Sequence, residues 1–238
     1  MYPDMSSMKN VKRIMLKLSG ETLKGNGEGS FDTDFINKLA KKIVALSKKK
    51  IEIVIVLWAG NIIRGTQFDA VNRITGDYLG MVGTVINATV VAEAIQNNWG
   101  KAKVFTSLDM PKVAASFFRR EALDRIKAGE IVFCAGWTGS PFCTTDSAAV
   151  QKALELNCDV VVKATKVDGI YDKDPMKHKN AKRFDHINLT EVYKLGLNIM
   201  DHSAIAMAMD NKLPMFVCKI DDLEKLGSNK IVGTYVGV

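Results

Sequence analysis

The chain has 238 residues, of which 47% are hydrophobic and 25% charged, a composition typical of a soluble globular protein with a sizeable core. No apolar run approaches the ~20 residues of a membrane helix, and the polar N-terminus lacks the apolar core of a signal peptide. We therefore expect a cytoplasmic protein with no membrane partner. The formal net charge of +7 lies largely in short surface runs such as 48–50. Without basic–aromatic repeats or a recognised binding module, we do not expect a nucleic-acid partner.

The cysteines and histidines give no sign of a metal site. The four cysteines are widely spaced and form no CxxC pair, and Cys134 and Cys158 fall in apolar runs, which favours buried thiols over metal ligands or disulfides. The three histidines show no metal-ligand spacing with the cysteines or with each other. We therefore expect neither a protein metal site nor a His-base enzyme.

Strand and helix patterns alternate along the chain after residues 1–10, which we expect to form a flexible leader. The first half predicts a strand at 13–20, a helix at 32–50 with an Asp or Thr cap, a strand at 51–57, a helix at 76–98 and a strand at 101–108. The second half predicts a helix at 111–129 that opens on Pro111, a strand at 130–137, a helix at 144–157 and a strand at 158–165.

The remaining segment begins with a polar stretch after Thr165 that predicts a hairpin or flap. Helices at 189–197 and 202–212 and strands at 213–220 and 231–237 follow. Apolar strands linked by helices predict an α/β fold with a central, mainly parallel sheet covered on both faces, a three-layer αβα sandwich. Since no linker or internal repeat divides the pattern, we expect residues 11–238 to form a single domain.

The residues suited to chemistry follow the predicted strands. In open parallel sheets a ligand binds beyond the carboxyl ends of the strands, and these ends read KLSG (17–20), WAGNIIRG (58–65), AGWTGSPFCTTDS (135–147) and KATKVDG (163–169). Backbone amides of small residues cradle an anion, and Lys or Arg neutralises it. No GxxxxGK[ST] motif is present, which excludes a P-loop enzyme, and GNGEGS (25–30) is expected to be a mobile loop.

Two charged residues stand out, although each also has a structural explanation. Lys17 lies one residue from the end of an apolar strand, where a cation needs an ion-pair partner or a bound phosphate. Asp146 lies in the first turn of a predicted helix, where a carboxylate complements the helix dipole whatever its function.

In combination, the strand-end motifs resemble those of bacterial-type UMP kinases, members of the amino-acid-kinase superfamily. They are KLSGE (17–21), GN..RG (60–65), GDYLGM (76–81), TGSPFCTTDSAA (138–149) and KATKVDGIYDKDP (163–175), in order over nearly the whole chain. The resemblance implies the amino-acid-kinase fold, a nucleoside-monophosphate kinase domain, and transfer of the γ-phosphoryl group of Mg²⁺-bound ATP to UMP. It also implies a homohexamer activated by GTP and inhibited by UTP, with the loop at 25–30 in the activation region.

The same resemblance assigns roles to individual residues. The catalytic residues would be Lys17, Arg64 and Asp146. ATP would contact Lys17, Leu18, Ser19, Gly20, Gly60, Arg64, Thr165, Tyr171 and Asp174. UMP would contact Ala59, Asp77, Thr138, Gly139, Ser140, Pro141, Phe142, Cys143, Thr144 and Thr145. No His or Cys base is needed, because a nucleotide phosphate with a second pKa of ~6 is largely ionised at neutral pH.

The sequence departs from the family pattern where Trp58 and Trp137 stand in place of small residues and Ser140 in place of Asn. Either the indoles fill space behind the loops, or they narrow the UMP pocket and change or abolish turnover. On neighbouring strands they would be able to pack on each other. The alternatives are a non-catalytic nucleotide- or oxyanion-binding member of the superfamily with a regulatory or storage role, and an amino-acid or carbamate kinase, against which TTDSAA and Asp77 argue.

Overall fold

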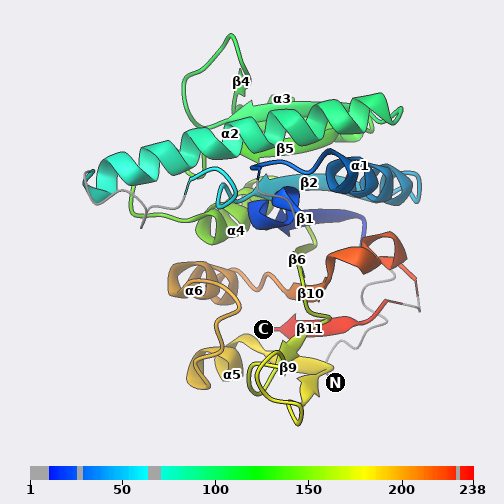
Figure 1. Cartoon of the computed structure of the whole chain (residues 1–238), viewed down its shortest axis with the longest axis vertical. Helices are drawn as coiled ribbons and strands as arrows, with labels where there is room; N and C mark the ends of the chain where they lie inside the picture. Colours follow the sequence, from blue (N-terminus) through cyan, green and yellow to red (C-terminus); the bar gives the residue numbers. More distant parts are fainter. Residues whose placement is uncertain (1–10, 26–28, 64–70, 229–230) are drawn as a thin grey trace.

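The computed structural model describes residues 11–25, 29–63, 71–228 and 231–238 (Figure 1). The sheet strands are β1 (Arg13–Leu18), β2 (Glu52–Leu57), β3 (Ala102–Thr106), β4 (Ala115–Ser116), β5 (Ile131–Ala135), β6 (Val160–Thr165), β9 (His186–Asn188), β10 (Met215–Lys219) and β11 (Gly233–Gly237). The α-helices are α1 (Thr33–Ser47), α2 (Arg73–Asn97), α3 (Arg119–Lys127), α4 (Thr145–Glu155), α5 (Leu189–Lys194) and α6 (His202–Asp210). Two 3-10 helices are η2 (Gly20–Lys24) and η4 (Ile220–Lys225).

These strands form one nine-stranded sheet in the order β4-β3-β5-β2-β1-β6-β10-β11-β9. All neighbouring pairs are parallel except β10 and β11, which confirms the predicted mainly parallel α/β sheet. The polar segment after Thr165 forms the predicted hairpin, in which β7 (Ile170–Tyr171) pairs antiparallel with β8 (Arg183–Phe184). The carboxyl ends of β1, β2, β5 and β6 therefore lie at one edge of the sheet.

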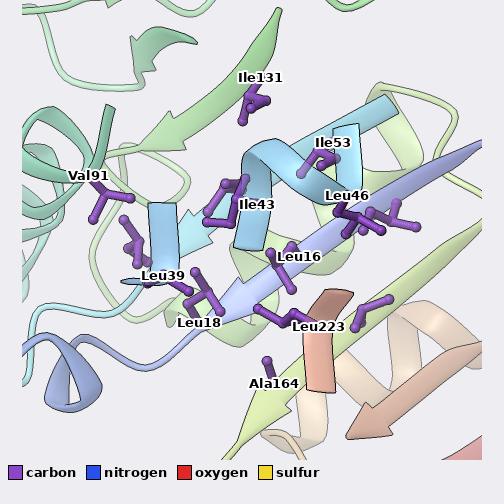
Figure 2. Packing of buried hydrophobic residues seen from close by; sticks show 14 of the residues in the cluster. Leu16, Leu18, Leu39, Ile43, Leu46, Ile53, Val91, Ile131, Ala164 and Leu223 are labelled. Carbon is purple, nitrogen blue, oxygen red and sulfur yellow. The ribbon is translucent and has the colours of Figure 1, made fainter. Parts of the chain in front are cut away.

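The side chains of β1 alternate between two helix layers. Ile14, Leu16 and Leu18 belong to a buried cluster with residues of α1, α2 and η4, part of which Figure 2 shows. Met15 belongs to the cluster on the other face, with residues of α3, α4, α5 and α6. Helices thus cover both faces of the sheet, as predicted. Because strand side chains alternate, Lys17 shares the face of Met15 and points toward the layer of α4.

Helix α2 is long and apolar enough to cross a membrane by length and composition, but 56% of the candidate span is buried inside the fold. It contacts α1 and β3 (Figure 1). Small residues permit this close packing: a Cβ added at Gly83 would lie 2.8 Å from the Cβ of Ala59. These properties are those of a core helix in a soluble protein.

The prediction of one helix over 111–129 is wrong in its first half. Ala115 and Ser116 form β4, which pairs with β3, and α3 begins only at Arg119. Phe117 packs edge-on against Phe105 of β3, with ring centroids 6.3 Å apart. Packing of this apolar run at the sheet edge outweighs the helical pattern that follows Pro111.

The cysteines predicted to be buried are buried. Burial raises the pKa of Cys134 and of Cys218 to about 12, and it also raises the pKa of Cys158. These thiols therefore remain protonated at neutral pH and pack as small apolar groups.

The start of α1 offers a direct test of local stability. Asp32 caps the helix, as predicted, by accepting a hydrogen bond from the N–H of Phe35 at 2.9 Å. Asp32→Ala is expected to lower the free energy of unfolding by ~1 kcal/mol, because that N–H loses its acceptor. Urea denaturation measures the loss. Asp34→Ala, which removes an exposed carboxylate from the same turn, is the control, and an equal loss in both variants would contradict the capping role.

Candidate active site

The sheet register places two lysines side by side. In the parallel pairing of β1 with β6, Lys17 lies opposite Lys163. The neighbours of Lys163 in the strand alternate as those of Lys17 do: Val161 faces the layer of α4, whereas Val162 faces the layer of α1. Both ammonium groups therefore point from the end of the sheet toward the N-terminus of α4.

The two lysines converge on one carboxylate. Lys17 Nζ lies 2.7 Å from Asp146 Oδ1, and Lys163 Nζ lies 3.9 Å from Asp146 Oδ2. The side chains of Lys17, Asp146 and Lys163 are 10%, 16% and 19% exposed. Oδ1 accepts no hydrogen bond of ordinary geometry despite the short distance, so the contact is chiefly electrostatic. Two cations and one anion leave this cluster with an excess of positive charge.

Lys163 is a site residue that the sequence analysis did not assign. Burial is the main cause that lowers the pKa of Lys163 to about 8, the nearby charge of Lys17 adds to the shift, and Asp146 opposes it. The ammonium also donates a hydrogen bond to the carbonyl of Ile199. A signal was present in the sequence, because Lys163 interrupts the apolar strand VVVKAT much as Lys17 interrupts RIMLKL.

Two cavities meet at Lys163. A cavity of about 600 Å³ is lined in part by Thr165, Tyr171 and Asp174, the residues expected to hold the adenosine of ATP. The structure thus brings these three predicted residues together. Tyr171 also donates a hydrogen bond to Asp168 Oδ1 at 2.7 Å, which fixes its ring at the cavity wall.

The second cavity, of about 220 Å³, is the more cationic of the two. The charged residues that line it are Lys17, Lys163, Lys166 and Glu21, and Ser19 also lines it. It shares Lys163 and Thr165 with the larger cavity, so the larger cavity adjoins one that is lined by three lysines and one glutamate. This order matches a nucleoside followed by its phosphates.

Gly20, another predicted ATP contact, lies where the ends of β1 and β2 approach closely. A Cβ added at Gly20 would lie 1.9 Å from the carbonyl oxygen of Trp58, which leaves no room for any side chain. Asn87 of α2, fully buried, donates hydrogen bonds to that carbonyl at 2.8 Å and to Asn61 Oδ1 at 2.7 Å. This buried amide, which the sequence analysis did not single out, holds the segment after β2 in place.

Several predicted contact residues have side chains that face away from both cavities. Leu18 is fully buried on the α1 side of the sheet, and Ala59 is buried against Gly83 of α2. Contacts of these residues with a nucleotide would have to come from the backbone. Arg64 lies outside the described residues, as do 26–28 of the predicted activation loop.

On the acceptor side, Asp77 and the loop at 138–144 lie together, as predicted. Asp77 Oδ2 accepts a hydrogen bond from the N–H of Phe142 at 2.8 Å, which joins the first turns of α2 to the loop. Arg73 Nε lies 3.9 Å from the same oxygen, and the Arg73 guanidinium lies 4.9 Å from the centroid of the Phe142 ring. One carboxylate oxygen of Asp77 thus joins α2 to the loop.

Thr144 and Asp201 fix the start of α4 and hence the position of Asp146. Thr144 Oγ1 accepts a hydrogen bond from the N–H of Asp146 at 2.9 Å and donates to the Asp201 carboxylate. Asp201, the N-cap of α6, was not identified from the sequence. Burial pushes the pKa of Asp201 upward, but hydrogen bonds outweigh this effect and hold the pKa below its usual range. They come from Ser203, Thr144, the N–H of Ala204, and Ser147.

The two indoles pack against different glycines. A Cβ added at Gly60 would lie 2.4 Å from Cζ3 of Trp58, so that ring covers Gly60. Trp137, 9% exposed, packs on Gly80 and in a cluster with Met81. Strands β2 and β5 are neighbours, yet no ring contact joins the two indoles within the described ranges. The position of Trp137 supports the account in which the indole fills space behind the loop.

The site has few groups that hold a metal by themselves. In the part of the chain that the structure describes, no three His, Cys, Asp or Glu side chains converge as metal ligands. Asp146, which contacts Lys17 and Lys163, fits a Mg²⁺ ion held mainly by nucleotide phosphates and water, because Mg²⁺ often takes only one or two protein carboxylates.

Comparison with known proteins places this geometry in a family. The model of the amino acid kinase family matches residues 12–219. A uridylate kinase of Xanthomonas campestris pv. campestris is 42% identical over 208 residues, 87% of each chain. A uridylate kinase of Rickettsia bellii is 43% identical over 220 residues, 92% of each chain.

Solved structures give the same result. The crystal structure of UMP kinase from Bacillus anthracis has a TM-score of 0.91 at 31% identity and covers 95% of this chain and 96% of its own. That of UMP kinase from Ureaplasma parvum has a TM-score of 0.89 at 30% identity, with 96% and 100% covered. The family model, the sequence likeness over most of the chain and the shared fold agree, and the protein belongs to the amino acid kinase family, among the uridylate kinases.

Proposed function

We propose that this protein is a UMP kinase, which transfers the γ-phosphoryl group of ATP to UMP and yields ADP and UDP. The convergence of Lys17 and Lys163 on Asp146, beside two cavities that share Lys163 and Thr165, carries the proposal. The names of the relatives, uridylate kinase and UMP kinase, identify the acceptor class.

The chemistry requires alignment and charge neutralisation rather than a base. A phosphate oxygen of UMP attacks the γ-phosphorus, the bond from that phosphorus to the β–γ bridging oxygen breaks, and ADP leaves with the electron pair. The phosphate of UMP is already ionised at neutral pH, since its second pKa is ~6. Lys17 and Lys163 would neutralise charge on the γ-phosphoryl oxygens and the leaving group, while Asp146 keeps the two ammonium groups together.

Both nucleotides have candidate contacts at the strand ends. Thr165, Tyr171 and Asp174 would hold the adenosine, and the segment 17–20 would contact the ATP phosphates. The loop residues 138–145 would hold the base and phosphate of UMP, and Asp77 would accept hydrogen bonds from its ribose hydroxyls.

Additional positive charge would complete the site. Mg²⁺ bound with ATP would lower the charge of the phosphates, and Asp146 is the protein carboxylate placed to support it. Arg64, which lies beyond the described residues, is proposed as a further cation beside the transferring group, with Gly60 next to it.

A homohexameric assembly is also proposed. Ile74, Tyr78 and Ile86 are exposed at intervals of four and eight residues along α2, so one face of this helix carries an apolar stripe that suits a second copy. GTP and UTP are proposed as effectors, with the loop at 25–30 involved in activation. A role in pyrimidine nucleotide biosynthesis, in the cytoplasm, follows from the proposed reaction.

Acceptor specificity tests the proposal directly. A coupled assay of ADP release with ATP and Mg²⁺ should give turnover with UMP that exceeds turnover with CMP, dUMP, carbamate or amino acids. Binding of UMP without formation of ADP would instead support the non-catalytic member of the superfamily. Turnover with an amino acid or carbamate would support the amino-acid or carbamate kinase alternative.

Lys17 can be tested by truncation. Lys17→Ala is expected to lower kcat by ~10²–10³, because the variant loses one preorganised cation of the transition state. Arg64→Ala is expected to cause a loss of the same size. Steady-state kinetics at saturating nucleotides measure the effect, circular dichroism checks the fold, and Lys41→Ala on the exposed face of α1 is the control. Near-normal turnover of Lys17→Ala would refute its assigned role.

The lowered pKa of Lys163 predicts how the activity of the enzyme depends on pH. The lowered pKa means that the cation is present below about pH 8 and is lost as the pH rises through that value, well before the ordinary value of 10.5. We expect kcat/KM to fall on the alkaline side near pH 8, because this ratio reports the free enzyme. Bound phosphates stabilise the protonated form of Lys163, so kcat, which reports the enzyme with its substrates bound, should decrease only at a higher pH than kcat/KM does.

Substitution identifies the titrating group. Lys163→Arg should remove the alkaline limb near pH 8, because a guanidinium stays charged there. Lys166→Arg, at another cation of the same cavity, should retain it. A limb unchanged by Lys163→Arg would assign the titration to a different group.

A further inference from the structure

The predicted UMP loop is attached to one face of α2. Asp77, Gly80 and Thr84 lie three and four residues apart, which places them on the same side of the helix. Thr84 Oγ1 accepts a hydrogen bond from the N–H of Gly136 at 2.9 Å, and Asp77 Oδ2 accepts one from the N–H of Phe142 at 2.8 Å. Gly80 lies between these two attachments.

The indole of Trp137 occupies the position between them. A Cβ added at Gly80 would lie 2.8 Å from Cζ2 and 3.2 Å from Cη2 of Trp137, so the ring fills the volume that a side chain at position 80 would take. Trp137 also packs with Met81 of α2 and Ala148 of α4. These helices cover opposite faces of the sheet, and the indole therefore wedges the two layers together at the mouth of the site.

Packing, rather than hydrogen bonding, holds this indole. Within the described part of the chain, Trp137 Nε1 is buried and has no hydrogen-bond partner. The backbone carbonyl of Trp137 accepts a hydrogen bond from Ser107 Oγ at 3.1 Å, which fixes the start of the loop from the other side.

The backbone at both ends of the loop adopts a conformation that side chains rarely favour. Trp137 has φ of 49° and Phe142 has φ of 66°, both in the left-handed region. In a loop this conformation costs free energy that local contacts offset. The packing of the Trp137 ring on Gly80, here called the Trp137–Gly80 seat, is one such contact, and the hydrogen bond from the Phe142 N–H to Asp77 is the other. Residues 138–141 lie between these two contacts.

We infer that the Trp137–Gly80 seat holds the loop at 138–141 in the shape that binds UMP, which makes Trp137 a positioning residue for the acceptor. This inference rests on the proposed UMP kinase function. Trp137 acts through the loop, so its loss should weaken acceptor binding more than it slows the phosphoryl transfer of bound substrates.

Kinetics separate this role from a general loss of structure. Trp137→Gly is expected to raise KM for UMP about tenfold or more and to change KM for ATP and kcat by less than about threefold. Gly80→Ala should also raise KM for UMP, because its methyl group displaces the ring. In the double variant, Gly80→Ala should add little to Trp137→Gly, since the ring that it would displace is gone.

Trp99 provides a matched control. It is also a tryptophan in the left-handed region, with φ of 66°, but it is 93% exposed. Trp99→Gly removes an indole and the same backbone strain, and it should leave both KM values unchanged. Trp137→Phe, which retains a smaller ring, should give a KM for UMP between those of the unaltered protein and Trp137→Gly, and it serves if the glycine variant fails to fold.

Calorimetric titration with UMP gives a readout that does not depend on turnover. The Kd for UMP should rise in Trp137→Gly and Trp137→Phe and stay constant in Trp99→Gly. An unchanged Kd for UMP in both Trp137 variants would overturn the inference. So would an equal rise of KM for ATP and for UMP in Trp137→Gly. Additive effects of Gly80→Ala and Trp137→Gly on KM for UMP would also contradict it. If the unaltered protein bound UMP but formed no ADP, the proposed function would fail while the Kd comparison still decided the role of the seat.

Discussion

The ion cluster of Lys17, Asp146 and Lys163 is the constraint on which the site depends. The parallel register of β1 and β6 forces two lysines into adjacent positions on the same face of the sheet. Two largely buried ammonium groups repel each other and lose hydration, so they need a counter-charge within reach. Asp146 supplies it from the first turn of α4, where the helix dipole also favours a carboxylate. The N-terminus of α4 is therefore fixed over the end of the sheet, and net positive charge remains for an anionic ligand.

The acceptor side is tied to this cluster by short polar links. Thr144 caps α4 next to Asp146 and donates to Asp201 at the start of α6. The loop that precedes Thr144 reaches α2 through the hydrogen bond from Phe142 to Asp77. These polar residues thus lie at the N-terminal ends of helices, around the carboxyl ends of the sheet strands. This arrangement suits a reaction that depends on the alignment of two phosphates, and it explains why no His or Cys base is required.

The two tryptophans that depart from the family pattern occupy volume that neighbouring glycines leave empty. Trp58 covers Gly60, and Trp137 fills the side-chain space of Gly80, so each large ring lies against a residue without a side chain. Interiors are close-packed, and a ring of this size is accommodated only where its neighbour leaves that volume empty. Trp137 also joins α2 and α4 across the end of the sheet.

The sequence by itself determined the alternation of strands and helices, the cap at Asp32 and the importance of Lys17 and Asp146, because periodicity, capping and an isolated charge in an apolar strand are local signals. The likeness of its strand-end motifs to a known family added the loop at 138–145 and the adenosine residues. Only the tertiary structure decided that Lys163 lies beside Lys17, that Asp201 supports the start of α4 and Asn87 the segment after β2, and that the run before α3 forms β4. Each of these depends on strand register or on contacts between segments far apart in the chain. Such contacts leave no periodic trace in the sequence, since they arise from which elements pack together and not from the local preference of any one of them.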